Sequence, residues 1–254
     1  MKKILLPTDF SDNSWNAITY ALQLFKDTEC NFCLLNTYTP IIYHYEQMYT
    51  SSAEFGLLDA VKQASQNGLD TFKEKIEKEF SNPKHIISTI SAFNTLFGEI
   101  DELHEGNAID FIIMGTQGAT GAKEILFGSN TVQMFKNAKC PVLAVPSSFT
   151  FEKPHDILFP SDYEIDFQEK HIQLIRSIAS LYNARVNILN VSYGYDLSEN
   201  QMNSQKKLGR LFKGVTHLFH SVRNESVPEA ITKFQMKTKI NLLVMINNKH
   251  SFFE

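Results

Sequence analysis

Cysteine is scarce in this sequence, with three residues among 254. Cys30 and Cys33 form a C-x-x-C pair, but they lie in a strand-like run, where positions three apart face opposite sides. A redox pair favours a helix N-terminus, which lowers the thiol pKa, and a zinc site needs two further ligands nearby. Cys140 has no partner in the sequence. We therefore interpret the C-x-x-C pair as buried, reduced thiols and not as a redox or metal site.

Clustered basic residues and long apolar runs are also lacking. The formal net charge is -4 and no basic run occurs, which argues against the electrostatic footprint of a nucleic-acid-binding protein. No apolar run approaches the roughly 20 residues that a membrane-spanning helix requires. The apolar start at residues 4–6 ends at Pro7, so it is too short for the core of a signal peptide. We expect a cytoplasmic protein without nucleic-acid or membrane partners, whose 43% hydrophobic residues suffice for a real core.

What the sequence does contain is a glycine-rich loop, which follows the apolar run at residues 109–113. That run predicts a buried strand, and residues 130–137 predict an amphipathic helix with Ser129 as its N-cap. The loop glycines tolerate positive φ and let a ligand approach the backbone, yet the loop matches neither the Walker pattern nor G-x-G-x-x-G. A strand, a glycine loop and a helix N-terminus together favour phosphate binding. From these residues alone, a plain strand-to-helix connection stays open as the alternative.

Strand-like and helix-like segments alternate through the first 146 residues. Predicted strands cover residues 3–6, 32–36, 85–90, 109–114 and 142–145. Predicted helices begin at Ser11 or Asp12 and cover residues 53–80, 95–104 and 130–137 further on. Helices between strands imply crossover connections, and hence a mostly parallel sheet with helices on both faces. Ligands of such sheets bind beyond the carboxyl ends of the strands, where Asp9, Thr37 and Gly115 fall.

The spacing G-x2-G-x9-G-S from Gly115 to Ser129 resembles the nucleotide-binding signature of the universal stress protein family. The segments at residues 4–11, 123–127 and 140–146 also resemble that family, so the likeness covers residues 1–146. It implies ATP as the ligand, with Mg²⁺ neutralising the phosphates. The site residues that it implies are Pro7, Thr8, Asp9, Thr37, Met114, Gly115, Gly118, Gly121, Gly128, Ser129, Asn130 and Thr131.

Within this set, the resemblance places Asp9 near the ribose and the main chain around Thr37 at the adenine. The N–H and hydroxyl donors to the phosphates would come from Gly128, Ser129, Asn130 and Thr131. No Lys or Arg falls on these phosphate-facing positions, so binding would rest on dipoles and the metal. That composition predicts a modest affinity.

A second, altered copy of the pattern follows a predicted linker at residues 149–154. Residues 157–163 repeat residues 4–10, residues 188–190 repeat 34–36, and residues 240–245 repeat 109–114. Ile246 then takes the place of Gly115, Lys249 takes that of Gly118, and the sequence ends before any counterpart of the fifth strand. We expect two α/β domains, at residues 1–148 and 155–254, with tandem Rossmann-like folds of the adenine nucleotide alpha hydrolase type. The second repeat is expected to be incomplete, or the chain cut short, and to lack the phosphate loop.

The resemblance favours a regulatory or sensory stress-response protein that binds one ATP in its first domain. A dedicated enzyme is not expected, because related nucleotide folds transfer adenylyl groups with a His-x-Gly-His motif or a Ser-Gly-Gly loop, and neither occurs. Slow ATP hydrolysis, with Asp9 as the candidate base, and a nucleotide-free interaction module stay open as alternatives. By resemblance, Val142-Leu143-Ala144-Val145 is an edge strand. We expect it to pair with a second chain in a homodimer, because the second repeat lacks the strand that would cover it.

Overall fold

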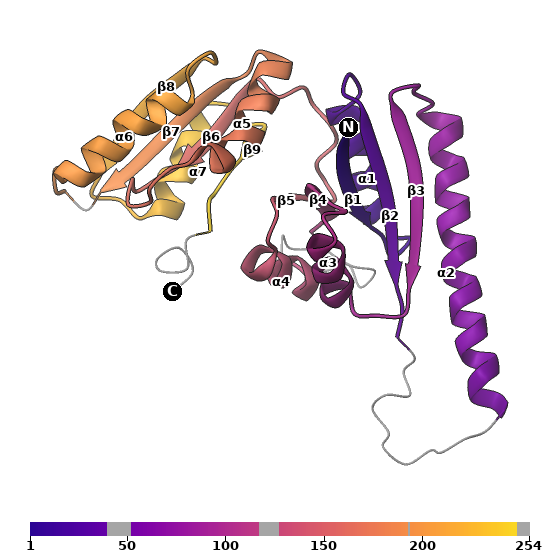
Figure 1. Ribbon diagram of the computed structural model, residues 1–254. Helices are drawn as coiled ribbons and strands as arrows, with labels where there is room; N and C mark the ends of the chain where they lie inside the picture. The colour runs from indigo at the N-terminus through magenta and orange to yellow at the C-terminus, as the bar shows by residue number, and fades with distance from the viewer. Residues whose placement is uncertain (40–51, 117–126, 193, 248–254) are drawn as a thin grey trace. The chain divides into compact units, whose positions relative to one another are not determined.

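The chain forms two compact units, Met1–Phe151 and Glu152–Glu254, in the computed structural model shown in Figure 1. The structure describes residues 1–39, 52–116, 127–192 and 194–247. Among these residues, no helix combines the length and the apolar character needed to cross a membrane.

The first unit is built on a five-stranded parallel sheet with the strand order β3-β2-β1-β4-β5. Its strands are β1 (Lys2–Pro7), β2 (Cys30–Thr37), β3 (His85–Ala92), β4 (Phe111–Gly115) and β5 (Val142–Val145). Its helices are α1 (Asp12–Leu24), α2 (Ser52–Glu79), α3 (Leu96–Glu105) and α4 (Ser129–Asn137). Because β2 and β4 lie on opposite sides of β1, the direction of winding reverses between β1 and β4. Sheets of this kind bind ligands at the carboxyl ends of the two strands that flank the reversal.

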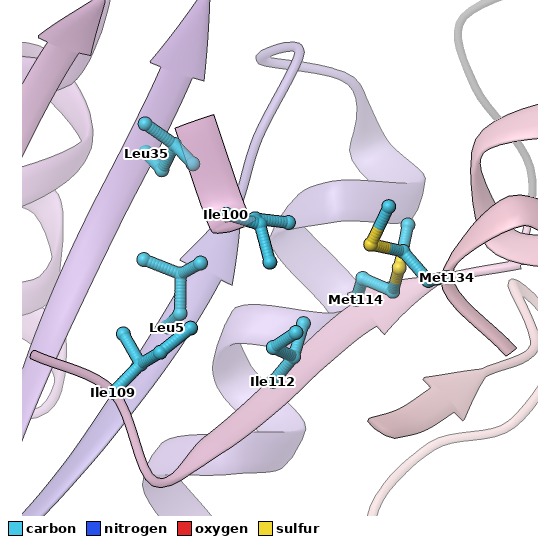
Figure 2. Packing of buried hydrophobic residues seen from close by; sticks show 7 residues of the cluster. All are labelled: Leu5, Leu35, Ile100, Ile109, Ile112, Met114 and Met134. Carbon is cyan, nitrogen blue, oxygen red and sulfur yellow. The ribbon is translucent and has the colours of Figure 1, made fainter. Parts of the chain in front are cut away.

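One face of this sheet packs against α3 and α4 through a cluster of apolar side chains, which Figure 2 shows. The cluster comprises Leu5, Leu35, Ile100, Ile109, Ile112, Met114 and Met134, each at most 6% exposed. The register pairs Leu5 of β1 with Ile112 of β4, so the two central strands present neighbouring side chains to this face. Met134 reaches the cluster from α4 and fixes that helix against the end of β4. Truncation to alanine in such a cluster costs about 2–5 kcal/mol, so the helix is firmly placed.

The opposite face of the sheet is covered by α1 and α2. Helix α1 contacts β4 and β5, while α2 contacts β2 and β3. Phe72 of α2 meets Phe10 and Trp15 edge to face, with ring centroids 5.4 and 5.2 Å away. These aromatic contacts tie the turn after β1 and the start of α1 to the long helix α2.

The second unit repeats this arrangement with fewer strands. Its elements are β6 (Asp156–Pro160), α5 (Glu169–Tyr182), β7 (Arg185–Ser192), α6 (Glu199–Leu211), β8 (His217–Arg223), α7 (Val227–Lys237) and β9 (Leu242–Leu243). The four described strands are parallel and follow the order β8-β7-β6-β9, which matches β3-β2-β1-β4 of the first unit. The predicted α/β, Rossmann-like fold in two repeats is confirmed, and the second repeat is the shorter.

The turn after the first strand of each unit is the same in its backbone. Phe10 and Tyr163 both adopt the left-handed conformation, with φ of 63° and 61°, which is uncommon for an aromatic residue. In each case the backbone N–H donates to the hydroxyl two residues earlier, that of Thr8 at 3.0 Å and that of Ser161 at 3.1 Å. This hydrogen bond stabilises a sharp turn that directs the chain out of the sheet at the carboxyl edge.

A second shared link joins this turn to the neighbouring strand. The side-chain amide of Asn36 donates to the carbonyl of Thr8 at 2.7 Å, and that of Asn190 donates to the carbonyl of Ser161 at 2.9 Å. The two units therefore keep one hydrogen-bonded frame at the ends of their first two strands.

Candidate functional site

The first predicted site residues, Pro7 and Thr8, lie at the carboxyl end of β1 and are buried. The hydroxyl of Ser14 donates to the carbonyl of Ser11 at 2.8 Å and lies 2.9 Å from the Thr8 hydroxyl. Since each hydroxyl carries one proton, the Thr8 hydroxyl donates to Ser14 while it accepts from the Phe10 N–H. The Thr8 side chain thus holds the turn together, and Thr8 lines the site through its main chain.

Asp9 lies between Thr8 and Phe10 in this turn and is exposed at the edge of the sheet. Its Oδ1 accepts two hydrogen bonds from Ser11, from the N–H at 3.1 Å and from the hydroxyl at 2.5 Å. Ser11 is also the N-cap of α1, where its side chain accepts from the N–H of Ser14 at 3.2 Å. These bonds hold the carboxylate in one orientation beside the start of α1, where the resemblance places a ribose.

Thr37 is the last residue of β2 and pairs with Ala92 of β3. The chain stays attached to β3 one residue further, because the N–H of Tyr38 donates to the carbonyl of Ala92 at 3.0 Å. The main chain expected to meet adenine therefore stands at the same edge of the sheet as Asp9.

Met114 and Gly115 end β4, and the surroundings of each constrain what it can present to a ligand. The Met114 side chain is 6% exposed and lies in the apolar cluster, so only its main chain faces the site. Gly115 is not in the left-handed region, since the positive-φ glycines of the described residues are Gly194 and Gly214. A Cβ on Gly115 would instead fall 2.4 Å from Nδ2 of Asn13, so the constraint at Gly115 is one of space.

The base of the glycine loop is closed by hydrogen bonds between its two ends. The N–H of Gly128 donates to the carbonyl of Thr116 at 2.7 Å, and the buried Thr131 hydroxyl donates to the carbonyl of Gly115 at 3.1 Å. The family resemblance assigns both groups to phosphates, and in the structure they bind main-chain carbonyls and shape the loop's base. Gly118 and Gly121 lie outside the described residues.

Helix α4 begins at Ser129, and its N-cap is Gly128, so the predicted N-cap Ser129 is wrong. Gly128 is tied to Thr116, which places the helix start one residue earlier than expected. Ser129 and Asn130 are exposed in the first turn, and the N–H groups of residues 129–131 have no acceptor within the helix. These N–H groups point along the helix axis to where phosphate is expected.

The start of α4 differs from the starts of four other helices. Helices α1, α3, α6 and α7 each have a Ser or Thr N-cap whose side chain accepts a backbone N–H, and each has an acidic residue in the first turn. Helix α4 has no side-chain cap hydrogen bond and no acidic residue in its first turn. Among the described residues, its positive end thus has neither a side-chain cap nor an acidic neighbour in the first turn, whereas the other four helix starts have both.

The thiols take no part in this site. Burial raises the pKa of Cys30 and of Cys140 to about 11, and it also raises the pKa of Cys33. Cys30 is fully buried and Cys33 half-buried, and the predicted C-x-x-C pair spans opposite faces of β2. Within the described ranges, no three His, Cys, Asp or Glu side chains gather as a metal ion would require.

Two residues of this region were missed by the prediction. Asn36 bridges β2 to the turn after β1, and its recurrence as Asn190 in the second repeat is a signal visible in the sequence. Asn13 lies against Gly115, about a hundred positions away in the chain, and no local pattern points to that contact.

The chain is similar to known proteins over its first unit. The sequence model of the Universal stress protein family matches residues 1–146. A universal stress protein of Methanocaldococcus jannaschii is 31% identical over 146 residues, which make up 57% of this chain and 81% of that protein. Another universal stress protein of the same organism is 29% identical over 157 residues, 57% of this chain and 94% of that protein.

A solved structure shares the fold of both units. The crystal structure of a universal stress protein from Archaeoglobus fulgidus matches 96% of this chain and 86% of its own, with a TM-score of 0.69. At 18% sequence identity, this likeness concerns the fold alone.

Proposed function

The chain belongs to the universal stress protein family, and from this premise we propose that its first unit is a regulatory module that binds one ATP. The observation that carries the proposal is the uncapped start of α4, which has no acidic residue in its first turn and lies at the carboxyl end of β4, where Gly128 binds Thr116. A helix N-terminus of this kind favours a phosphate group by its free N–H groups and its dipole.

The proposed orientation of the ligand follows from two parts of the site, the carboxyl ends of β1 and β2 and the start of α4. Adenosine would lie at the ends of β1 and β2, against the main chain of Pro7, Thr8 and Thr37, with Asp9 at the ribose. The phosphates would extend past Gly115 to the N–H groups of α4 at Ser129 and Asn130. The glycines at 118 and 121 would complete the loop, as the sequence pattern implies. Mg²⁺ would neutralise phosphate charge that the protein meets only with dipoles.

The hydrogen bonds of Asp9 favour a binding role over dedicated catalysis. Rapid phosphoryl transfer needs a positioned base and a cationic group at the phosphates. Both hydrogen bonds from Ser11 fall on Oδ1 of Asp9, which makes this carboxylate a fixed acceptor for turn and ribose. We therefore place the function in sensing or regulation through nucleotide occupancy, with ATP hydrolysis slow at most.

The second unit is proposed to be nucleotide-free. The register of β9 places Ile246 where Gly115 stands in the first unit, since Leu158 pairs with Leu243 as Leu5 pairs with Ile112. The residues from Ile246 onward include no glycine, so the given sequence of this unit has no counterpart of the glycine loop on which the proposed site depends.

A substitution at the start of α4 tests the proposed site. Ser129→Asp gives α4 the acidic first residue that Asp12 gives α1. The helix should gain about 0.3–1 kcal/mol from its dipole, while the ATP dissociation constant rises about tenfold through repulsion of the phosphates.

Adenosine should bind Ser129→Asp as it binds the wild type, because it carries no phosphate. Ser129→Asn, similar in size and uncharged, is the matched control and should keep most of the ATP affinity. Unchanged ATP binding by Ser129→Asp in titration calorimetry would show that the phosphates lie elsewhere.

We also infer a homodimer formed along β5, the edge strand of the five-stranded sheet. The carbonyls of Pro141 and Val145 accept N–H groups from the β4 side, so by alternation the N–H and C=O groups of Val142 and Ala144 point outward. Leu143 shares a face of β5 with the buried Val145, which makes Leu143 a poor test position.

Ala144→Pro removes an outward N–H and leaves the bonds to β4 in place. We expect light scattering to show a wild-type dimer and an Ala144→Pro monomer. A wild-type monomer at micromolar concentration would contradict the inferred dimer.

A further inference from the structure

Gly115 is held from two sides at the point where β4 leaves the sheet. On one side, its carbonyl accepts the hydroxyl proton of Thr131 at 3.1 Å. On the other, its Cα faces the side chain of Asn13, which is in the first turn of α1. A Cβ built on Gly115 would come within 2.4 Å of Nδ2, 2.7 Å of Cγ and 3.0 Å of Oδ1 of Asn13. The carboxamide therefore occupies the space that any other residue at position 115 would fill with its own side chain.

Backbone conformation gives no competing reason for glycine here. Gly115 lies in β4 with ordinary strand pairing to Val145, and its φ is not in the left-handed region. An alanine could adopt this backbone without strain. The absence of a side chain at position 115 is thus explained by the space that Asn13 needs.

The contact belongs to the unit that carries the glycine loop. In the second unit Ile246 stands at the position of Gly115, and α5 begins at Glu169, seven residues after Asp162. In the first unit α1 begins at Asp12, three residues after Asp9. The earlier helix start brings the first turn of α1, with Asn13, next to the end of β4.

We propose that Asn13 is a positioning residue of the nucleotide site, and that Gly115 lacks a side chain in order to admit the Asn13 carboxamide. This inference rests on the proposed function. Asn13 and Thr131 would together fix Gly115 at the carboxyl end of β4. The alternative is that position 115 lacks a side chain so that the nucleotide itself can approach. In that case replacing Asn13 would leave nucleotide affinity unchanged.

A double-mutant cycle separates these two explanations. The variants are Gly115→Ala, Asn13→Ala and the pair combined, with ATP and adenosine affinities measured by calorimetry and stability by urea unfolding. Gly56→Ala is the control for a glycine substitution, because no atom lies within 4 Å of the added Cβ.

We expect Gly115→Ala alone to weaken ATP binding about tenfold, since the new Cβ displaces the Asn13 carboxamide. In the Asn13→Ala background the same substitution should cost less than about twofold, because the space is then free. Asn13→Ala should weaken ATP binding several-fold, and ATP more than adenosine, since Asn13 contacts the end of β4, past which the phosphates would extend. A purely structural role would weaken both ligands equally.

Additive effects of the two substitutions on ATP affinity would overturn the inference, as would Asn13→Ala with wild-type affinity. Failure of the wild type to bind any nucleotide would instead refute the proposed function. In that case the unfolding data still decide whether Asn13 and Gly115 are coupled, and additive unfolding free energies would overturn the coupling itself.

Discussion

After β1 and after β6 the chain makes the same left-handed turn. The two units nevertheless differ at the end of the neighbouring strand, which is β4 in the first unit and β9 in the second. Thr8 and Ser161 accept the same backbone hydrogen bond, and an asparagine of the neighbouring strand donates to the same carbonyl in each unit. The first unit continues from β4 through Gly115 to an uncapped helix. The second reaches Ile246 at that point. The shared hydrogen bonds therefore belong to the fold, and the features found in the first unit are the ones that we propose bind a ligand.

This comparison separates stability from binding within one molecule. Hydrogen bonds present in both units are expected to stabilise both units, whichever of them binds a nucleotide. Groups found in the first unit alone are expected to affect ATP affinity with little effect on folding.

The shared asparagines provide the largest expected effect on stability. Asn36→Ala and Asn190→Ala each leave a main-chain carbonyl without its amide donor, which costs about 1–3 kcal/mol of unfolding free energy. Asn190 is 4% exposed and Asn36 is half-buried, so the loss should be greater in the second unit. Hydrogen exchange followed by mass spectrometry assigns each loss to its unit. ATP affinity should fall for Asn36→Ala and stay unchanged for Asn190→Ala, and equal losses of affinity would break the distinction between the units.

A smaller effect is expected from alkaline pH, because all three cysteines lie in the first unit. Burial raises the pKa of Cys30 from 9.0 to about 11 in the folded state. Between these values the unfolded thiol ionises and the folded one does not, so stability present below pH 9 is lost as the pH rises.

For Cys30 the loss amounts to about 1 kcal/mol of unfolding free energy between pH 9 and pH 10. Cys30→Ala should flatten this slope in urea unfolding, although it lowers stability at neutral pH by leaving a small cavity. Tyr163 of the second unit has a pKa raised above 10.0 by burial, so that unit should lose stability only at still higher pH. A slope that is unchanged in Cys30→Ala would assign the effect to another group.

The elements of the fold were largely predictable, because parallel strands buried on both faces form continuous apolar runs. The predicted fifth strand, residues 142–145, coincides with β5, and the predicted helix at residues 53–80 differs from α2 by one residue at each end. Strand β4 begins at Phe111, two residues later than predicted, although Ile109 is buried next to it. Burial without ladder pairing cannot be recognised from hydrophobicity.

The site was predictable where its parts follow one another in the chain. Glycine spacing and the end of β4 locate the loop, but the sequence pair Gly128-Ser129 does not say which residue caps α4. That choice depends on the hydrogen bond from Gly128 to Thr116 across the loop's base. Met114 lies on the same strand face as Ile112, so its burial in the core could have been predicted. The prediction placed Met114 in the site because it precedes the glycine motif. The role of Asn13 could not be predicted from the sequence, because its contact with Gly115 exists only in the folded chain.

The number of ATP molecules bound per chain tests the central claim most directly. Titration calorimetry of the full chain with ATP and Mg²⁺ should give a stoichiometry near one, since the open start of α4 and Gly115 lie in the first unit and the described part of the second has no counterpart of either. Gly118→Val should abolish that single site while the protein stays folded, because a branched side chain blocks approach to the loop. Two equivalent sites per chain, or one site that survives in Gly118→Val, would contradict the account.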